Sequence, residues 1–156
     1  MVIALAACAP SEERAIRNQL SDIAETLSVP ANDGDLGRLA RVASLRNALA
    51  PDVQVLTGVT LRPGAQIPSE ISGRDGVLAL VGRWSPPPGG LTVEFVDMQV
   101  TLDDSRTSAQ VYCTAKLTSG TAEPPVVDAR ELTVGFSLID GEWLITSIRP
   151  EETLSR

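Results

Sequence analysis

The sequence contains no histidine, and this absence excludes several kinds of active site at once. Serine and cysteine nucleophiles usually need an imidazole base, and zinc sites usually take imidazole or several thiolates as ligands. The chain has only two cysteines, Cys8 and Cys113, so neither kind of site can be built from it. Catalysis would have to use carboxylates, tyrosine, arginine or backbone donors. We expect neither a metal ion nor a cofactor.

Aromatic residues and positive charge are also scarce. Proteins that bind single-stranded nucleic acid combine aromatic stacking platforms with a basic patch, and the five aromatics of this chain do not alternate with one. With 13 basic against 20 acidic side chains, the net charge is -7, which repels phosphate backbones and anionic lipid head groups. We therefore expect no nucleic-acid partner.

The length of 156 residues and the hydrophobic share of 43% are typical of one globular domain. We expect a signal remnant or lipidated tether over residues 1–11, a folded domain over residues 12–150, and a short tail over residues 151–156. Cys113 alternates with apolar residues in a predicted strand, so we expect a buried thiol that acts as a small hydrophobic side chain.

Residues 1–9 form an apolar run far shorter than the ~20 residues that a membrane helix needs. The run ends in Leu5-Ala6-Ala7-Cys8, which resembles the lipobox of bacterial lipoproteins and implies a lipid on Cys8. A signal peptide begins with a basic segment, and no Arg or Lys precedes Arg14, so we expect the true start upstream. This interpretation places the protein in the bacterial cell envelope, periplasmic or on the outer surface, held to the membrane only by that lipid. The alternative is an alanine-rich terminus without lipid and a cytoplasmic protein.

Helical spacing dominates the first half of the chain. Ser11 and the two glutamates after it predict a capped helix that ends near Ser28, before Pro30. Asp35 is placed to cap a second helix, and a capping-box-like start over residues 72–75 predicts a third. The predicted apolar stripes are Ile16, Leu20, Ile23 and Leu27, then Leu36, Leu39 and Ala43, then Val77, Leu80, Val81 and Trp84.

Two turn or loop segments are open to more than one interpretation. The acidic turn over residues 31–35 could suggest calcium, but the EF-hand spacing is missing and a plain turn is favoured. Residues 52–59 alternate between apolar and polar side chains, which predicts a short strand. The proline-rich segment over residues 85–90 predicts a stiff loop between helix and sheet rather than a polyproline ligand.

From Leu91 the hydrophobic period changes to two, which predicts an antiparallel meander. The expected strands are Leu91 to Leu102, Thr107 to Thr118, Val126 to Ile139 and Glu142 to Arg149. The apolar phase switches from odd to even positions between Phe95 and Asp97, so we expect a β-bulge there, and Gly135 marks a second bend. The predicted class is α+β, with N-terminal helices packed on a long, bent antiparallel sheet that forms a cone with a pocket.

The order of these elements and several short motifs resemble the nuclear transport factor 2-like superfamily, which has a cystatin-like fold and includes polyketide cyclases (SnoaL-like), ketosteroid isomerase and scytalone dehydratase. The motifs that carry the resemblance are Asn32-Asp33-Gly34-Asp35-Leu36, Leu49-Ala50-Pro51-Asp52-Val53, Ile71-Ser72-Gly73-Arg74-Asp75 and Asp140-Gly141-Glu142-Trp143-Leu144-Ile145. The resemblance covers roughly residues 12–150. It implies a pocket between helices and sheet and frequent dimerisation through the sheet.

Five residues are candidates to line such a pocket: Trp84, Phe95, Asp97, Tyr112 and Phe136. Asp97 could be a carboxylate in an apolar pocket, but its position at the bulge favours a solvated side chain. Tyr112 shares a strand face with Gln110 and Thr114, which favours an exposed or dimer-facing position.

Asp128 and Arg130 share one side of their strand and could grip a polar ligand, although such charges usually pair with each other. No catalytic residue is assigned. We expect a non-catalytic domain at the envelope that binds a small apolar ligand or another protein and forms a homodimer. The alternative is a carboxylate-dependent isomerase, dehydratase or cyclase that acts on a small apolar substrate.

Overall fold

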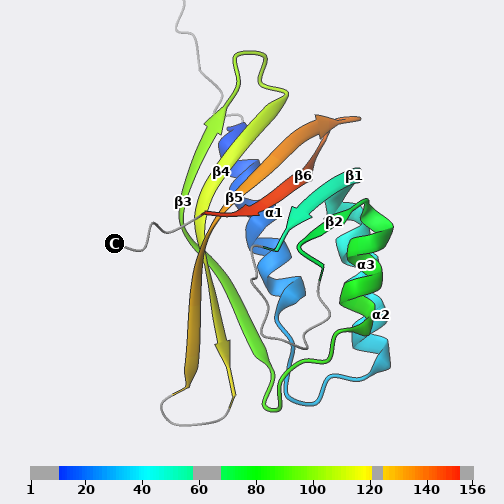
Figure 1. Ribbon diagram of the computed structural model, residues 1–156. Coiled ribbons are helices and arrows are strands. Elements are labelled where there is room, and N and C mark those ends of the chain that lie inside the picture. Colours follow the sequence, from blue (N-terminus) through cyan, green and yellow to red (C-terminus); the bar gives the residue numbers. More distant parts are fainter. Residues whose placement is uncertain (1–10, 58–67, 121–124, 152–156) are drawn as a thin grey trace, which may run out of the picture.

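The computed structural model describes residues 11–57, 68–120 and 125–151, which form three helices and six strands (Figure 1). The helices are α1 (Glu12–Leu27), α2 (Asp35–Ala48) and α3 (Arg74–Arg83). The strands are β1 (Leu49–Leu56), β2 (Glu70–Ser72), β3 (Leu91–Leu102), β4 (Ser108–Ser119), β5 (Val126–Ile139) and β6 (Glu142–Pro150). No helix among the described residues is long and apolar enough to cross a membrane.

The strands form one sheet in the order β2-β1-β6-β5-β4-β3, and the helices lie on one side of it (Figure 1). This arrangement confirms the α+β class and the long, bent sheet. One neighbouring pair, β1 with β6, is parallel, so the sheet is mixed rather than wholly antiparallel. Local alternation of apolar residues carries no information about this pairing, because the two strands lie far apart in the chain.

The first helix begins as predicted, with the backbone N–H of Arg14 donating to Ser11 Oγ over 3.2 Å. The caps predicted for the other two helices are wrong. Gly34 and Gly73 occupy the N-cap positions, and neither helix has a side-chain cap. Asp35 instead lies in the first turn of α2, where its carboxylate faces the positive end of the helix dipole.

The stripe predicted for α2 is also wrong. Leu36 and Leu39 are 83% and 66% exposed, whereas Arg41, Leu45 and Ala48 are buried. The rotation of α2 is fixed by its C-terminal end, because Ala48 leads directly into β1, whose first residues belong to the core.

Both predicted bends are present in the sheet. The pairing of β3 with β4 shifts between Val96 and Gln99, and Asp97 takes a φ of 54° there. The pairing of β5 with β6 shifts next to Gly135. A Cβ at Gly135 would overlap Ser147 Oγ, so glycine leaves room for the Ser147 hydroxyl where the two strands approach closely.

The core lies between α1, α2 and the sheet around the fully buried Ile16, Leu20, Phe136 and Ile145. Cys113 belongs to it with 0% exposure, as the strand pattern predicted. Desolvation in this core raises the pKa of the Cys113 thiol to about 11. The thiol is therefore neutral and unreactive near neutral pH.

Candidate functional site

The cone holds a pocket of about 650 Å³ between the helices and the half of the sheet that precedes its bends. This volume lies within the range of small-molecule sites. The helices contribute Leu27, Leu80, Val81 and Trp84 to its apolar wall. The sheet contributes the remaining apolar residues of the lining, which are Leu91, Val93, Phe95, Ala115, Leu117, Leu132 and Ile148.

Backbone and hydroxyl hydrogen bonds tie the end of α1 to the start of β3 and so fix one wall of the pocket. Val29 and Leu91 exchange two backbone hydrogen bonds, of 2.7 and 2.8 Å. Ser28 Oγ accepts a hydrogen bond of 2.9 Å from the backbone N–H of Val93. Gly90 allows this contact because a Cβ at that position would overlap the Val29 carbonyl oxygen. Leu91 and Val93 are thereby held facing the cavity.

Arginine supplies every charged side chain among the described residues that line this pocket. Arg41 is 7% exposed, and its Nη2 lies 2.9 Å from Asp33 Oδ2. Its Nε donates to the Thr26 carbonyl oxygen over 3.2 Å. The acidic turn that could have suggested calcium thus provides the counter-ion of a buried arginine. No group of three or more potential metal ligands occurs among the described residues.

The mouth of the pocket is marked by its three exposed lining residues, Arg83, Trp84 and Arg130. Arg83 and Trp84 lie at the C-terminal end of α3, and Arg130 lies in β5. Arg130 Nε is 3.1 Å from Asp128 Oδ2, and both side chains are more than half exposed. Asp128 and Arg130 therefore pair with each other, and Arg130 also faces the cavity.

Two of the five candidate pocket residues, Trp84 and Phe95, line this pocket, and the other three do not. Asp97 is exposed, because the left-handed backbone of the bulge turns it away from the core. Phe136 is 1% exposed and packs in the filled core, where it pairs across strands with Ala109 and Ile145. Cys8 lies outside the described residues.

Tyr112 lies in β4 between Val111 and Cys113, which are both buried, so its side chain points to the sheet face that the helices leave open. A hydrogen bond to the Glu131 carboxylate raises the pKa of Tyr112. This raised pKa follows from a surface contact, and the phenol cannot donate to a ligand in the cone.

Arg41 and Arg83 were not among the candidates from the sequence. A signal for Arg41 was present, since it stands four residues before Leu45 and seven before Ala48, in the phase of the buried stripe. An arginine in such a phase, with Asp33 shortly before it, indicates a buried ion pair. Arg83 offers no comparable signal, because an exposed arginine at a helix C-terminus is ordinary.

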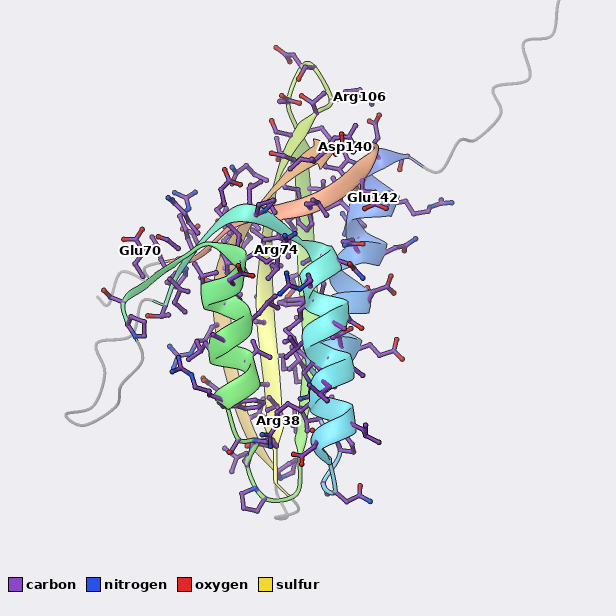
Figure 2. All side chains as sticks on the ribbon, turned by 90° about the vertical axis from the view of Figure 1, so that its right-hand side faces the viewer. Arg38, Glu70, Arg74, Arg106, Asp140 and Glu142 are labelled. Carbon is purple, nitrogen blue, oxygen red and sulfur yellow. The ribbon has the colours of Figure 1, made fainter. Side chains whose placement is uncertain are left out.

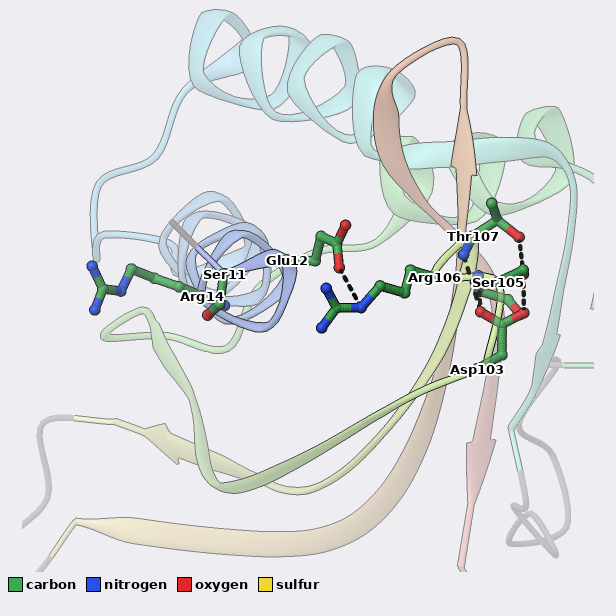
Figure 3. Close-up of polar contacts among 8 residues, drawn as sticks. Ser11, Glu12, Arg14, Asp103, Ser105, Arg106 and Thr107 are labelled. Atoms are coloured by element: carbon green, nitrogen blue, oxygen red, sulfur yellow. Dashed lines mark hydrogen bonds and ion pairs between the residues drawn. The ribbon is translucent and has the colours of Figure 1, made fainter. Parts of the chain in front are cut away.

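A second group of polar contacts ties α1 to the β3–β4 turn (Figure 3), and none of the residues that make them lines the pocket. Asp103 accepts hydrogen bonds from Ser105 Oγ and Ser108 Oγ and from the backbone N–H groups of Thr107 and Ser108. These bonds, the one from Ser105 first, hold the pKa of Asp103 well below its usual range. Arg106 Nε lies 3.4 Å from Glu12 Oε2. These contacts close the turn and are internal to the fold.

The shape of the chain is similar to several solved structures. An NTF2-like protein with a cystatin-like fold from Novosphingobium aromaticivorans superposes with a TM-score of 0.68 at 11% identity, over 92% of this chain and 83% of the other. The chain has the nuclear transport factor 2-like fold. An NTF2-like protein of unknown function from Pseudomonas putida has this fold too, with a TM-score of 0.66 at 13% identity, over 94% and 90% of the two chains.

A third structure with the nuclear transport factor 2-like fold is a proposed scytalone dehydratase from Novosphingobium aromaticivorans. It has a TM-score of 0.59 at 17% identity, over 90% of this chain and 85% of the other. No protein-family model matches the sequence, and no curated protein matches it significantly. The comparisons therefore establish the fold, and the function must be argued from the site.

Proposed function

We propose that this protein binds a small apolar molecule in the cone pocket and does not transform it. The observation that carries the proposal is the lining itself: about 650 Å³ walled by aliphatic and aromatic side chains. Most of these side chains are only half-buried, so a ligand would remove further apolar surface from water. Apolar walls of this kind favour ligand binding.

The chemistry of the lining favours binding over catalysis. An isomerase, dehydratase or cyclase needs a group that takes up and returns a proton near neutral pH. The ionisable side chains that line the described pocket are those of Arg41, Arg83 and Arg130, and arginine stays protonated in this range. Asp97 and Tyr112 lie elsewhere. The similar shape of a proposed scytalone dehydratase is a likeness of fold and brings no proton-transfer group to this pocket.

The envelope location is part of the same proposal. It rests on the segment Leu5-Ala6-Ala7-Cys8, which lies before the described domain. A lipid on Cys8 would hold a binding domain close to a membrane, where apolar molecules accumulate. Radiolabelled fatty acid should be incorporated in the native host by the wild type and not by a Cys8→Ser variant. Equal labelling of the two, or none in either, contradicts the lipoprotein hypothesis.

Binding can be tested with the neutral fluorescent probe N-phenyl-1-naphthylamine. The wild type should bind the probe with a rise in fluorescence. Ala115 is buried and lines the cavity, so the Ala115→Phe variant should fill it and weaken binding about tenfold or more. The control is Ala43→Phe, which adds the same side chain on the exposed face of α2 and should bind like the wild type.

Circular dichroism of each variant establishes that it is folded, and Val81→Phe serves as a second blocking variant if Ala115→Phe unfolds. An absence of probe binding by the wild type, or unchanged binding by a folded blocking variant, would overturn the proposal. So would proton exchange or double-bond migration on steroid-like or polyketide-like ketones that the blocking variants abolish, because that result favours an enzyme.

A further inference from the structure

The charge inside the cone pocket is opposite in sign to the charge of the chain. The protein carries a net charge of -7, yet all three charged residues in the described lining are arginines. A purely hydrocarbon ligand would contact the apolar wall but would make no use of the two cationic side chains at the mouth, Arg83 and Arg130. This combination matches a molecule that is apolar over most of its length and anionic at one end.

The three arginines differ in how much of their hydrogen-bonding capacity is free. Arg41 is buried and committed to Asp33 and to the Thr26 carbonyl, so its charge is balanced within the protein. Arg83 Nε donates to the Ala79 carbonyl oxygen over 3.3 Å. In the part of the chain that the structure describes, the two terminal nitrogens of Arg83 have no hydrogen-bond partner. These are the nitrogens that grip a carboxylate in bidentate geometry.

Arg130 is held by Asp128, but only loosely. Their side chains are 57% and 58% exposed, and exposed pairs of this kind contribute little to stability. A ligand anion can therefore take the place of Asp128, or share the guanidinium with it, without disturbing the fold. Because Arg83 and Arg130 both lie at the mouth, the free positive charge is located there and not in the depth of the cone.

Another basic side chain lies toward the same end of the helical layer. Figure 2 shows Arg38 between the N-terminal end of α2 and the C-terminal end of α3, the end that also carries Arg83. No ion pair joins Arg38 to any other described residue. Arg38 does not line the pocket, and Asp35 in the same part of α2 carries the opposite charge, so the contacts to an anionic ligand come from Arg83 and Arg130.

Given the proposed apolar binding site, on which this inference rests, we propose that the pocket selects amphipathic anions, molecules with one apolar body and one terminal carboxylate. The apolar body lies against Leu27, Val93, Phe95 and Leu132 inside the cone. The carboxylate lies between Arg83 and Arg130 at the mouth, with the exposed edge of Trp84 beside it. The anionic end stays close to water, so it keeps part of its hydration while it gains charge-assisted hydrogen bonds.

The test measures displacement of N-phenyl-1-naphthylamine by dodecanoate and by dodecanol, both at submicellar concentration and pH 8. The two competitors share their hydrocarbon chain and differ at the head group. Wild-type protein should bind dodecanoate about tenfold or more tightly than dodecanol, the difference expected from hydrogen bonds to a charged group. The Arg83→Gln/Arg130→Gln double variant should lose this difference and bind dodecanol as the wild type does.

The control variant is Arg14→Gln, which removes one positive charge at the start of α1, outside the pocket lining. It should keep the full preference for dodecanoate. Equal affinity of the wild type for acid and alcohol, or a preference that survives in the double variant, would overturn the inference and leave apolar binding intact. If the probe binds but neither compound displaces it, the inference also fails, whereas an absence of probe binding by the wild type is the outcome that refutes the proposed function.

Discussion

The buried ion pair between Asp33 and Arg41 allows a sharp test of how the helical layer is held together. The two side chains are 9% and 6% exposed, and the atoms that join them lie 2.9 Å apart. An Asp33→Ala substitution would leave the guanidinium buried with one carbonyl partner, at Thr26. Breaking a buried pair in this way costs about 3–5 kcal/mol of the free energy of unfolding. The whole free energy of unfolding of a domain of this kind is only about 5–15 kcal/mol, so the loss should be severe.

The assay is urea denaturation followed by circular dichroism at pH 7. An Arg41→Met substitution added to Asp33→Ala should recover most of the lost free energy of unfolding, because replacing both charged groups by apolar ones often leaves stability almost unchanged. The control is Asp75→Ala, which breaks the exposed Arg46–Asp75 pair and should cost at most about 1 kcal/mol. The reasoning is refuted if Asp33→Ala costs no more than Asp75→Ala, or if the double variant is as unstable as the sum of the single ones.

A glycine substitution tests the same pair without changing its charges. A Cβ at Gly37 would overlap Asp33 Oδ1, so Gly37→Ala should destabilise the protein although alanine ordinarily favours a helix by about 1 kcal/mol. Gly82→Ala is the matched control in α3, since its Cβ would meet Val42 Cγ2 at an ordinary 3.9 Å. That control should stabilise the protein by about 0.5–1 kcal/mol. Equal stabilisation by the two substitutions would contradict the packing of Asp33 against α2.

Three further predictions concern single groups. In a Cys8→Ser variant, the Cys113 thiol should resist Ellman's reagent at pH 8 until the protein unfolds, and prompt modification of the native protein would contradict this. Because burial raises the pKa of the Cys113 thiol, its contribution to the free energy of unfolding should be lost as the pH rises from about 9 to about 11. Because hydrogen bonds lower the pKa of Asp103, its carboxylate stabilises the turn above pH 3.8, and this contribution is lost as the pH falls. The Asp103→Asn variant should therefore have a lower free energy of unfolding than the wild type at pH 7 and the same one in strong acid. The sheet face that carries Tyr112 is free of helices, so we expect the homodimer to form through it. Light scattering at micromolar concentration should show twice the chain mass for the wild type and a monomer for Tyr112→Lys, and a monomeric wild type would count against the dimer.

The sequence was informative about the sheet because the relevant signals are local. Alternation places Leu91–Leu102 and Val126–Ile139 in strands with the bounds that the structure shows, and Asp140-Gly141 forms the predicted turn between β5 and β6. The parallel pairing of β1 with β6 was not predicted, because it joins segments that are distant in the chain.

The helical layer was harder to predict because its rotation depends on tertiary contacts. Leu36 and Leu39 suggested an apolar stripe, but the core contains the face with Leu45 and Ala48. Arg41 occupies the same face because Asp33 neutralises it. Hydrophobic periodicity treats an arginine as polar and therefore as exposed, so it cannot find a buried ion pair unless the residue phase is considered together with a nearby carboxylate.

The two bends in the sheet explain why one end of the cone is open and the other is filled. On β3, the residues before the bulge at Asp97, such as Phe95, line the pocket, whereas Met98 beyond it packs against the core. On β5, Leu132 lines the pocket before the bend at Gly135, and Phe136 after it is buried in the core. The extra residue at the bulge keeps the apolar side chains of both halves on the helix side, although their numbering changes from odd to even. Asp97 is thus the residue that the bend turns outward, and the pocket is left with apolar walls and arginines.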